Sequence, residues 1–119
     1  MSTAKGNQAE DAACQWLQKK GYVIVERNRR LGRGELDIIA IHDDILAFVE
    51  VKGHQNRTSS IEAMHRDKQQ RMVSAAQTWL GQHAEYMHHQ CRFDLVIVTP
   101  PTMRFLPSKV EHVEDIIRL

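Results

Sequence analysis

Two carboxylates and a lysine lie within apolar, strand-like segments of this chain: Asp37, Glu50 and Lys52. Charged side chains are uncommon in such segments unless they are paired or bind a ligand. Two neighbouring carboxylates repel each other, and a divalent cation would relieve that repulsion. Because Mg²⁺ and Mn²⁺ prefer oxygen ligands, these residues predict a metal site suited to phosphodiester hydrolysis.

The two acids are predicted to face each other across a β-hairpin. Residues 35–52 contain two apolar, β-branched runs, and Asp43-Asp44 between them is typical of a tight turn. A two-residue turn places Asp37 directly opposite Glu50, with Cβ atoms about 4.5–5.5 Å apart. In that register, the opposite face of the hairpin carries Leu36, Ile38, Ala40, Ala47, Val49 and Val51.

An ordinary ion pair at a sheet edge is the alternative for these charges. The pair would be Asp37–Lys52 or Glu35–Lys52, since the same register places Glu35 opposite Lys52, and surface pairs of this kind are common and weak. The combination of an acid pair, a lysine two residues after Glu50 and apolar surroundings favours the metal site. In a third interpretation the four charges only pair with one another, and the chain is a structural protein.

The spacing of these residues also resembles a known signature. Asp37 is followed, after twelve residues, by Glu50-Val51-Lys52, which is similar to the D…ExK pattern of the restriction-endonuclease-like nucleases. More closely, the chain resembles the small bacterial YraN family, which is similar to archaeal Holliday-junction resolvases. The matching pieces are Gly6, Glu10, Arg27-Asn28, Gly34 to Ala40, Phe48 to Lys52, Lys68-Gln69, Arg71 and Arg92-Phe93-Asp94.

This resemblance implies a metal-dependent endonuclease that acts on DNA, with branched or junction DNA as a candidate substrate. Asp37, Glu50 and the backbone carbonyl of Val51 would hold Mg²⁺ or Mn²⁺. Lys52 would position the attacking water or neutralise the developing charge. Glu10, at the edge of the apolar stripe of the first helix, would be a third carboxylate near the metal.

A basic run precedes the acidic hairpin. Between residues 19 and 33 there are six basic residues and one acid. We predict that Arg29, Arg30 and Arg33 guide a nucleic-acid backbone by charge, although such a run is by itself more often a solvated loop. The resemblance adds Lys68 and Gln69 as candidates for contacts to phosphate.

The chain departs from the family pattern after its lysine. The resemblance leads us to expect an arginine two residues after Lys52, where Gly53-His54 stands. The competing prediction is therefore a catalytically silent nucleic-acid-binding or interaction module that keeps the nuclease fold. The net charge of +1 by itself argues neither for nor against nucleic-acid binding, but its small size adds a little weight to the silent module.

Composition favours a single nuclease-like domain over residues 1–119. No apolar run approaches the length of a membrane span, and the N-terminus lacks an apolar signal-peptide core. Cys14 and Cys91 are far apart and suit free thiols in a reducing compartment, so we expect a cytoplasmic protein without membrane contact. Resolvase-like chemistry on two strands would suit a homodimer.

The apolar patterns predict an α/β fold, specifically a restriction-endonuclease-like sandwich with a central mixed β-sheet flanked by helices. Arg92 and Asp94 either pair within the sheet or orient the site, and we favour the structural role. The expected elements are a helix at 4–20 capped by Gly21, strands at 22–27, 35–42, 45–52 and 93–99, a polar loop at 53–60, a helix at about 61–82, a short strand at 103–106 and a final segment at 113–119.

Overall fold

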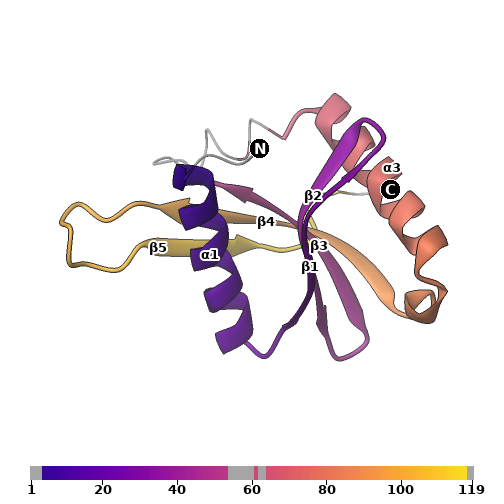
Figure 1. The fold of residues 1–119 in the computed structure, drawn as a ribbon, viewed down its shortest axis with the longest axis horizontal. Coiled ribbons are helices and arrows are strands. Elements are labelled where there is room, and N and C mark those ends of the chain that lie inside the picture. The colour runs from indigo at the N-terminus through magenta and orange to yellow at the C-terminus, as the bar shows by residue number, and fades with distance from the viewer. Residues whose placement is uncertain (1–3, 54–60, 62–63, 118–119) are drawn as a thin grey trace.

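A single five-stranded sheet with helices packed against it makes up the computed structural model, which describes residues 4–53, 61 and 64–117 (Figure 1). The strand order is β1-β2-β3-β4-β5; β3 and β4 are parallel and the other neighbours antiparallel. This is the predicted α/β class with a mixed sheet, consistent with a nuclease-like sandwich. The elements are α1 (Ala4–Lys19), β1 (Val23–Leu31), β2 (Gly34–His42), β3 (Ile45–Lys52), α3 (Arg66–Gln82), the 3₁₀ turn η1 (Ala84–Tyr86), β4 (Gln90–Thr99) and β5 (Lys109–Val113).

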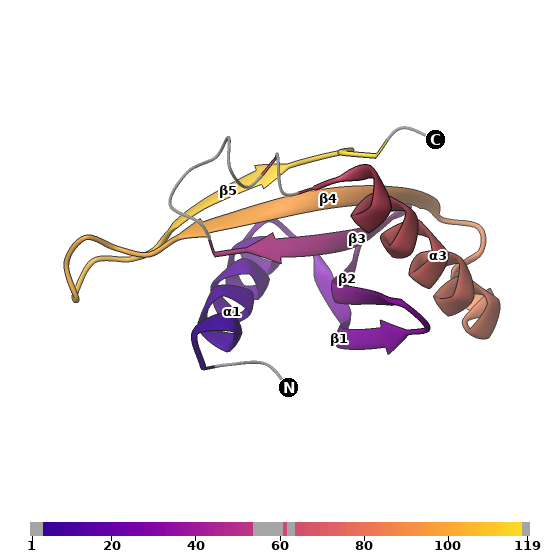
Figure 2. The ribbon, with the colours of Figure 1, turned by 90° about the horizontal axis from the view of Figure 1, so that it is seen from above.

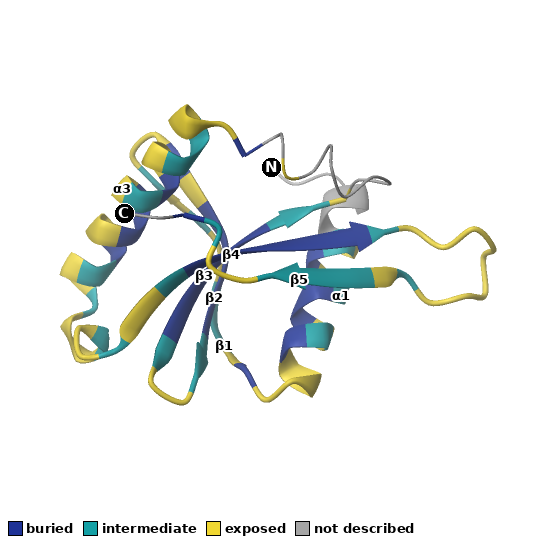
Figure 3. Ribbon diagram, turned by 180° about the vertical axis from the view of Figure 1, so that it is seen from behind, coloured by how far each residue is buried: buried dark blue, intermediate teal, exposed yellow. Residues whose placement is uncertain are grey.

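The sheet separates two hydrophobic clusters, each covered by one helix (Figures 2 and 3). On one side, α1 buries Ala13 and Leu17 against alternate residues of β2, β3 and β4. On the other side, α3 buries Met72 and Trp79 against the intervening residues of the same strands, among them Phe48. Because successive strand residues point to opposite faces, the central strands are apolar on both. No helix within the described part of the chain is long and apolar enough to cross a membrane.

The first helix ends as predicted. Gly21 adopts a φ of +97°, a left-handed conformation that glycine tolerates best. The Tyr22 N–H donates to the Leu17 carbonyl at 3.0 Å and thereby satisfies one of the last free carbonyls of the helix. The chain then enters β1.

The predicted register of the hairpin is confirmed. Its ladder runs from His42 opposite Ile45 to Ile38 opposite Val49. Asp43 takes a φ of +54° in the turn, which aspartate tolerates better than most residues. The ladder ends at Ile38 and Val49, before the predicted pairs Asp37–Glu50 and Glu35–Lys52, and Lys52 contacts Glu50 instead.

One residue of the hairpin lies on a different face from the one predicted. Leu36 was expected beside Ile38, but it joins the cluster under α3 together with Ile39. The regular β1–β2 pairing skips the step between Arg27 and Arg29, where Asn28 has a φ of +55°. Regular pairing with β3 ends at Ile38 opposite Val49, so Leu36 lies beyond the ladder that keeps β2 in strict alternation.

Three predicted boundaries were wrong. The basic segment after residue 27 is not a loop, because β1 continues to Leu31 and only Gly32-Arg33 forms a turn. Helix α3 begins at Arg66, since the backbone at His65 is extended. Residues 103–106 form an exposed turn, and the last strand is β5 instead, because the flanking prolines lack the N–H groups that a paired strand needs. The predicted loop at 54–60 lies outside the described residues.

Gly34 fixes how closely α3 approaches the hairpin. A Cβ atom at this position would collide with the backbone carbonyl of Arg71 and would touch the Ala75 side chain. We expect Gly34→Ala to reduce the free energy of unfolding by about 1–3 kcal/mol, because the helix must move away. Urea denaturation measures this change. Gly81→Ala, within α3 itself, is the control. Nothing lies within 4 Å of its added Cβ, so it should stabilise the helix by up to about 1 kcal/mol. Equal stability of the two variants would contradict the close packing at Gly34.

Candidate metal and phosphate site

Asp37 and Glu50 are the next residues after the regular β2–β3 ladder, at the end of the hairpin away from its turn. Their side chains are buried, with residue exposures of 9% and 6%. Asp37 Oδ2 accepts a hydrogen bond of 2.9 Å from the Val51 N–H, so its carboxylate reaches toward β3. The hairpin thus brings both acids to one place in the interior.

Burial raises the pKa of Asp37 to about 8, and repulsion from Glu50 adds to the increase. The hydrogen bond from Val51 opposes it only in part, while the charge of Glu10 contributes a smaller increase. A buried acid whose pKa is raised by a second acid is stabilised by whatever neutralises it, either a proton or a cation. The pair therefore favours a bound positive charge.

Two lysines already contact Glu50. Its Oε1 lies 2.8 Å from Lys68 Nζ and 3.3 Å from Lys52 Nζ. Burial, together with the nearby Lys68 ammonium, lowers the pKa of Lys52. Burial alone would also lower the pKa of Lys68, but the contact with Glu50 outweighs it and raises that pKa. Lys68 is thus the firmly charged member of the pair, and Lys52 the one that loses its proton more easily.

A polar cavity of about 230 Å³ opens over the two acids. It lies between the β1–β2 turn and the first turns of α3. The cavity brings together most of the residues that the sequence predicted for metal and phosphate. Its lining residues are Arg30, Arg33, Gly34, Glu35, Asp37, Glu50, Lys68, Arg71 and Met72.

Two predicted phosphate-binding residues are engaged elsewhere. Arg29 donates to Gln82 at 3.2 Å and lies 3.4 Å from Glu26. The Gln69 side chain donates to the Met64 carbonyl at 2.8 Å. Neither residue is among those that line the cavity. Of the phosphate-binding residues predicted, Arg30, Arg33 and Lys68 are the ones that line it.

Glu10 lies on α1, across the end of the hairpin from the cavity. It is buried, and its Oε1 has no hydrogen-bond partner, although the guanidinium of Arg27 lies 3.6 Å away. An unpartnered carboxylate oxygen is costly to bury. Since its charge also raises the pKa of Asp37, Glu10 belongs to the same electrostatic group as the acid pair.

Sequence reasoning did not assign Arg71 and Glu35 to the site. Arg71 lines the cavity together with Lys68. Residues three apart on a helix share a face, so the spacing of these two cations on α3 was a signal that could have identified Arg71. Glu35 also lines the cavity, at the start of β2.

The described residues contain no group of three or more histidine, cysteine or acidic side chains placed to hold a metal ion. The site offers two buried carboxylates, the exposed Glu35 and a group of cations. Mg²⁺ is commonly held by one or two carboxylates, with water and substrate phosphate completing its coordination. The donor set of Asp37 and Glu50 fits such an ion.

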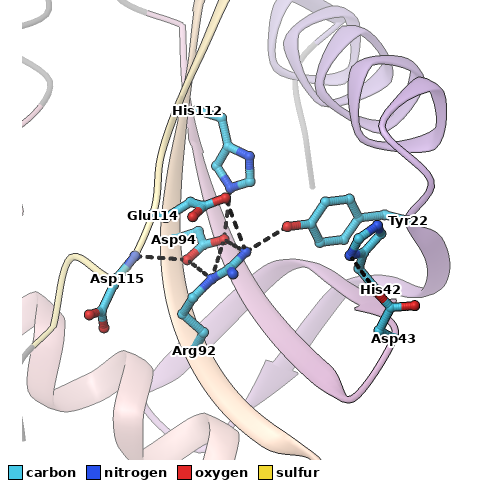
Figure 4. Close-up of polar contacts among 8 residues, drawn as sticks. All are labelled: Tyr22, His42, Asp43, Arg92, Asp94, His112, Glu114 and Asp115. Carbon is cyan, nitrogen blue, oxygen red and sulfur yellow. Dashed lines mark hydrogen bonds and ion pairs between the residues drawn. The ribbon is translucent and has the colours of Figure 1, made fainter.

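Arg92 and Asp94 form a separate buried network (Figure 4). Asp94 is fully buried; it accepts hydrogen bonds from Arg92 at 2.8 and 2.9 Å and lies 2.7 Å from His112 Nε2. The Asp115 N–H donates to it at 3.0 Å, and Arg92 also donates to the Tyr22 hydroxyl. The network ties β4 to β5 and to the start of β1, which agrees with the structural role favoured for Arg92 and Asp94.

Comparison with known proteins identifies the family. The model of the uncharacterised protein family UPF0102 matches residues 9–98. A UPF0102 protein of Magnetococcus marinus is 44% identical over 95 residues, covering 78% of this chain and 77% of that protein. A UPF0102 protein of Pseudomonas aeruginosa is 36% identical over 115 residues, covering 90% and 92%. The matched residues 9–98 include the acid pair, both lysines on Glu50, and Arg92 and Asp94 of the buried network. The chain therefore belongs to the UPF0102 family, the small bacterial YraN proteins that its sequence resembles.

Proposed function

We propose that this protein is a Mg²⁺- or Mn²⁺-dependent nuclease that hydrolyses phosphodiester bonds in DNA, branched DNA among them. The observation that carries this proposal is the cavity over Asp37 and Glu50. Two buried acids and the exposed Glu35 line it, together with four cations, Arg30, Arg33, Lys68 and Arg71.

This combination of charges suits a phosphodiester better than other substrates. A site for a cationic ligand would not need four basic residues around its acids, and a site for a simple anion would not need the acids. A phosphodiester held together with a divalent cation uses both, because the carboxylates bind the metal and the basic side chains bind the phosphate oxygens. Arginine side chains suit phosphate because their planar groups donate two parallel hydrogen bonds.

In this proposal, Asp37 and Glu50 hold the ion. A bound Mg²⁺ or Mn²⁺ would stabilise charge on the phosphoryl oxygens and make a bound water more acidic. Lys52, next to Glu50 and with a lowered pKa, would orient the attacking water or accept its proton. Lys68, whose pKa is raised, would stay charged and neutralise a phosphate oxygen.

One observation favours a catalytically silent nucleic-acid-binding module as the second candidate. Glu50 Oε1 already contacts two ammonium groups, so a metal must compete with them. A calorimetric Mn²⁺ titration separates the two candidates. Heat of binding that disappears in Glu50→Gln supports the nuclease, whereas DNA binding without any metal binding supports the silent module.

Cleavage of a DNA panel is the direct test. Labelled duplex, single-stranded, flapped and four-way-junction DNA would be incubated with the purified protein and Mn²⁺. We expect cleavage of at least one of these, and a loss of roughly 100-fold or more in Asp37→Asn and Glu50→Gln, because each removes a charge that holds the metal.

Asp44→Asn is the matched control, since it removes an exposed acid from the turn of the same hairpin. It should cut as fast as the wild type. Cleavage that survives in Asp37→Asn would come from another site or a contaminant and would refute the proposal.

A further inference from the structure

An exposed apolar turn lies at the end of the β4–β5 hairpin. We call residues 100–108 the hairpin tip. Met103, Phe105 and Leu106 are 53%, 79% and 42% exposed, and they are half of the large exposed hydrophobic residues in the described chain. The others are scattered: Val23, Ile61 and Met87. Three large apolar side chains exposed within four residues of one turn are typical of a binding surface.

The tip is ordered by its own chain. The Leu106 N–H donates to the Met103 carbonyl at 3.0 Å, which closes a turn with Arg104 and Phe105 at its centre. The strands below it stay paired up to Thr99 opposite Lys109. Figures 1 and 3 show the hairpin projecting beyond the rest of the molecule, with an exposed end. Phe105 therefore lies in a closed turn at the end of a paired hairpin, with 79% of its surface exposed.

The charges closest to the tip are positive. Between Val98 and Val110, which pair at the base of the tip, the charged residues are Arg104 and Lys109, and the nearest acid in the sequence is Glu111, opposite Ile97. The small apolar groove at the base of the tip, around Ala9, Gly53 and Pro101, has no acidic residue in its lining either. A second copy docking there would leave Arg104 without a partner in that groove. A nucleic acid offers both an aromatic base for Phe105 and phosphates for the cations.

The tip extends from the end of the sheet that carries the acid pair. Because β3 and β4 are parallel, Ile97 lies opposite Lys52, and the chain continues six residues further to Met103. Six residues span at most about 20 Å, which is no more than roughly six nucleotides of one strand. Along the longest axis, the end of β3 lies between the β1–β2 turn on one side and the hairpin tip on the other (Figures 1 and 2). One bound strand can thus reach both the cavity and the tip.

We propose that the hairpin tip is a wedge that stacks Phe105 on an unpaired base of the DNA whose backbone lies in the cavity. This inference rests on the proposed function and names the feature of DNA that the site selects, an unpaired or splayed base near the cleavage point. Met103 and Leu106 support the ring, and Arg104 contacts the neighbouring phosphate. Apolar side chains inserted between bases act in this way in other DNA-binding proteins.

The test measures DNA binding in an Asp37→Asn background, where cleavage does not interfere. The probe is a flapped DNA with 2-aminopurine at its unpaired branch point. Phe105→Ala should weaken binding by about 5- to 100-fold, the loss of one stacked base, and should remove the change in 2-aminopurine fluorescence. Phe105→Trp should restore both. Met87→Ala, which removes an exposed methionine from the loop before β4, should change neither.

The outcomes separate the wedge from the nuclease. If the wild type cuts DNA but Phe105→Ala binds the flapped DNA as tightly as its parent, the wedge is refuted and the nuclease stands. If light scattering shows a dimer that Phe105→Ala dissociates without weakening DNA binding, the tip binds a second copy and the wedge is refuted. If neither cleavage nor binding occurs with any DNA, both proposals fail.

Discussion

Asp94→Ala is expected to reduce the free energy of unfolding by about 3–5 kcal/mol, because it leaves a buried guanidinium without its partner. The Arg92 side chain is only 12% exposed, and the carboxylate of Asp94 is its main contact. The change also removes the acceptor for the Asp115 N–H and the contact with His112. Urea denaturation at neutral pH measures the loss, and a melting temperature lower by about 10 °C or more is expected.

The pH dependence of stability gives an independent reading of Asp94. Burial alone would raise its pKa, but hydrogen bonds from His112, Arg92 and the Asp115 N–H outweigh burial and lower it. An acid whose folded pKa is depressed contributes stability above its unfolded value, and that stability is lost as the pH falls through the folded pKa. The wild type should therefore lose stability below about pH 4 more steeply than Asp94→Asn.

Glu114→Gln is the matched control for this network. Glu114 is exposed and lies 3.7 Å from the same guanidinium. Surface pairs contribute about 1 kcal/mol or less, so this variant should unfold close to the wild type. If Glu114→Gln and Asp94→Ala lost similar amounts of unfolding free energy, the burial of Asp94 would not explain the cost of removing it.

Asp37→Asn is expected to stabilise the metal-free protein at alkaline pH while it abolishes metal binding. Burial and Glu50 raise the pKa of Asp37 from 3.8 in the unfolded chain to about 8 in the fold. At a pH between these two pKa values, the Asp37 carboxyl is ionised in the unfolded chain and protonated in the folded protein. The wild type should therefore lose up to about 1.4 kcal/mol of stability per pH unit as the pH rises through this window. The asparagine variant does not titrate there and should lack this slope.

Thermal unfolding at pH 5, 6.5 and 8, with EDTA and then with Mn²⁺, measures both effects. Saturating Mn²⁺ should stabilise the wild type at pH 8 by about 2.7 kcal/mol at 100 times the dissociation constant. It should leave Asp37→Asn unchanged, because the variant lacks a charged ligand. Asp44→Asn, at the exposed turn, should follow the wild type throughout. A wild-type stability that rises from pH 5 to pH 8 more than that of Asp37→Asn would contradict the raised pKa.

Local pattern was sufficient for much of the fold. Gly21 ended the first helix where its left-handed conformation was predicted, and the Asp43-Asp44 turn set the register of the hairpin. Strand boundaries that depend on pairing with another strand were predicted wrongly. The arginines of β1 look like a loop in sequence, but their backbone pairs with β2. The last strand lies at Lys109–Val113 and not at 103–106, because the prolines at 100, 101 and 107 lack the N–H groups that strand pairing needs.

The sequence by itself determined the acid pair, because a two-residue turn and strand alternation act over a few residues and leave one register in which the apolar face is buried. It therefore predicted that Asp37 and Glu50 meet, and with Lys52 it predicted the chemistry. The tertiary structure decided what surrounds them. Lys68 and Arg71 reach the cavity only because Gly34 lets α3 pack against the hairpin. Glu50 and Lys68 are 18 positions apart, and Gly34 and Arg71 are 37 apart. Packing of this kind depends on shape across the whole fold and is absent from local sequence patterns.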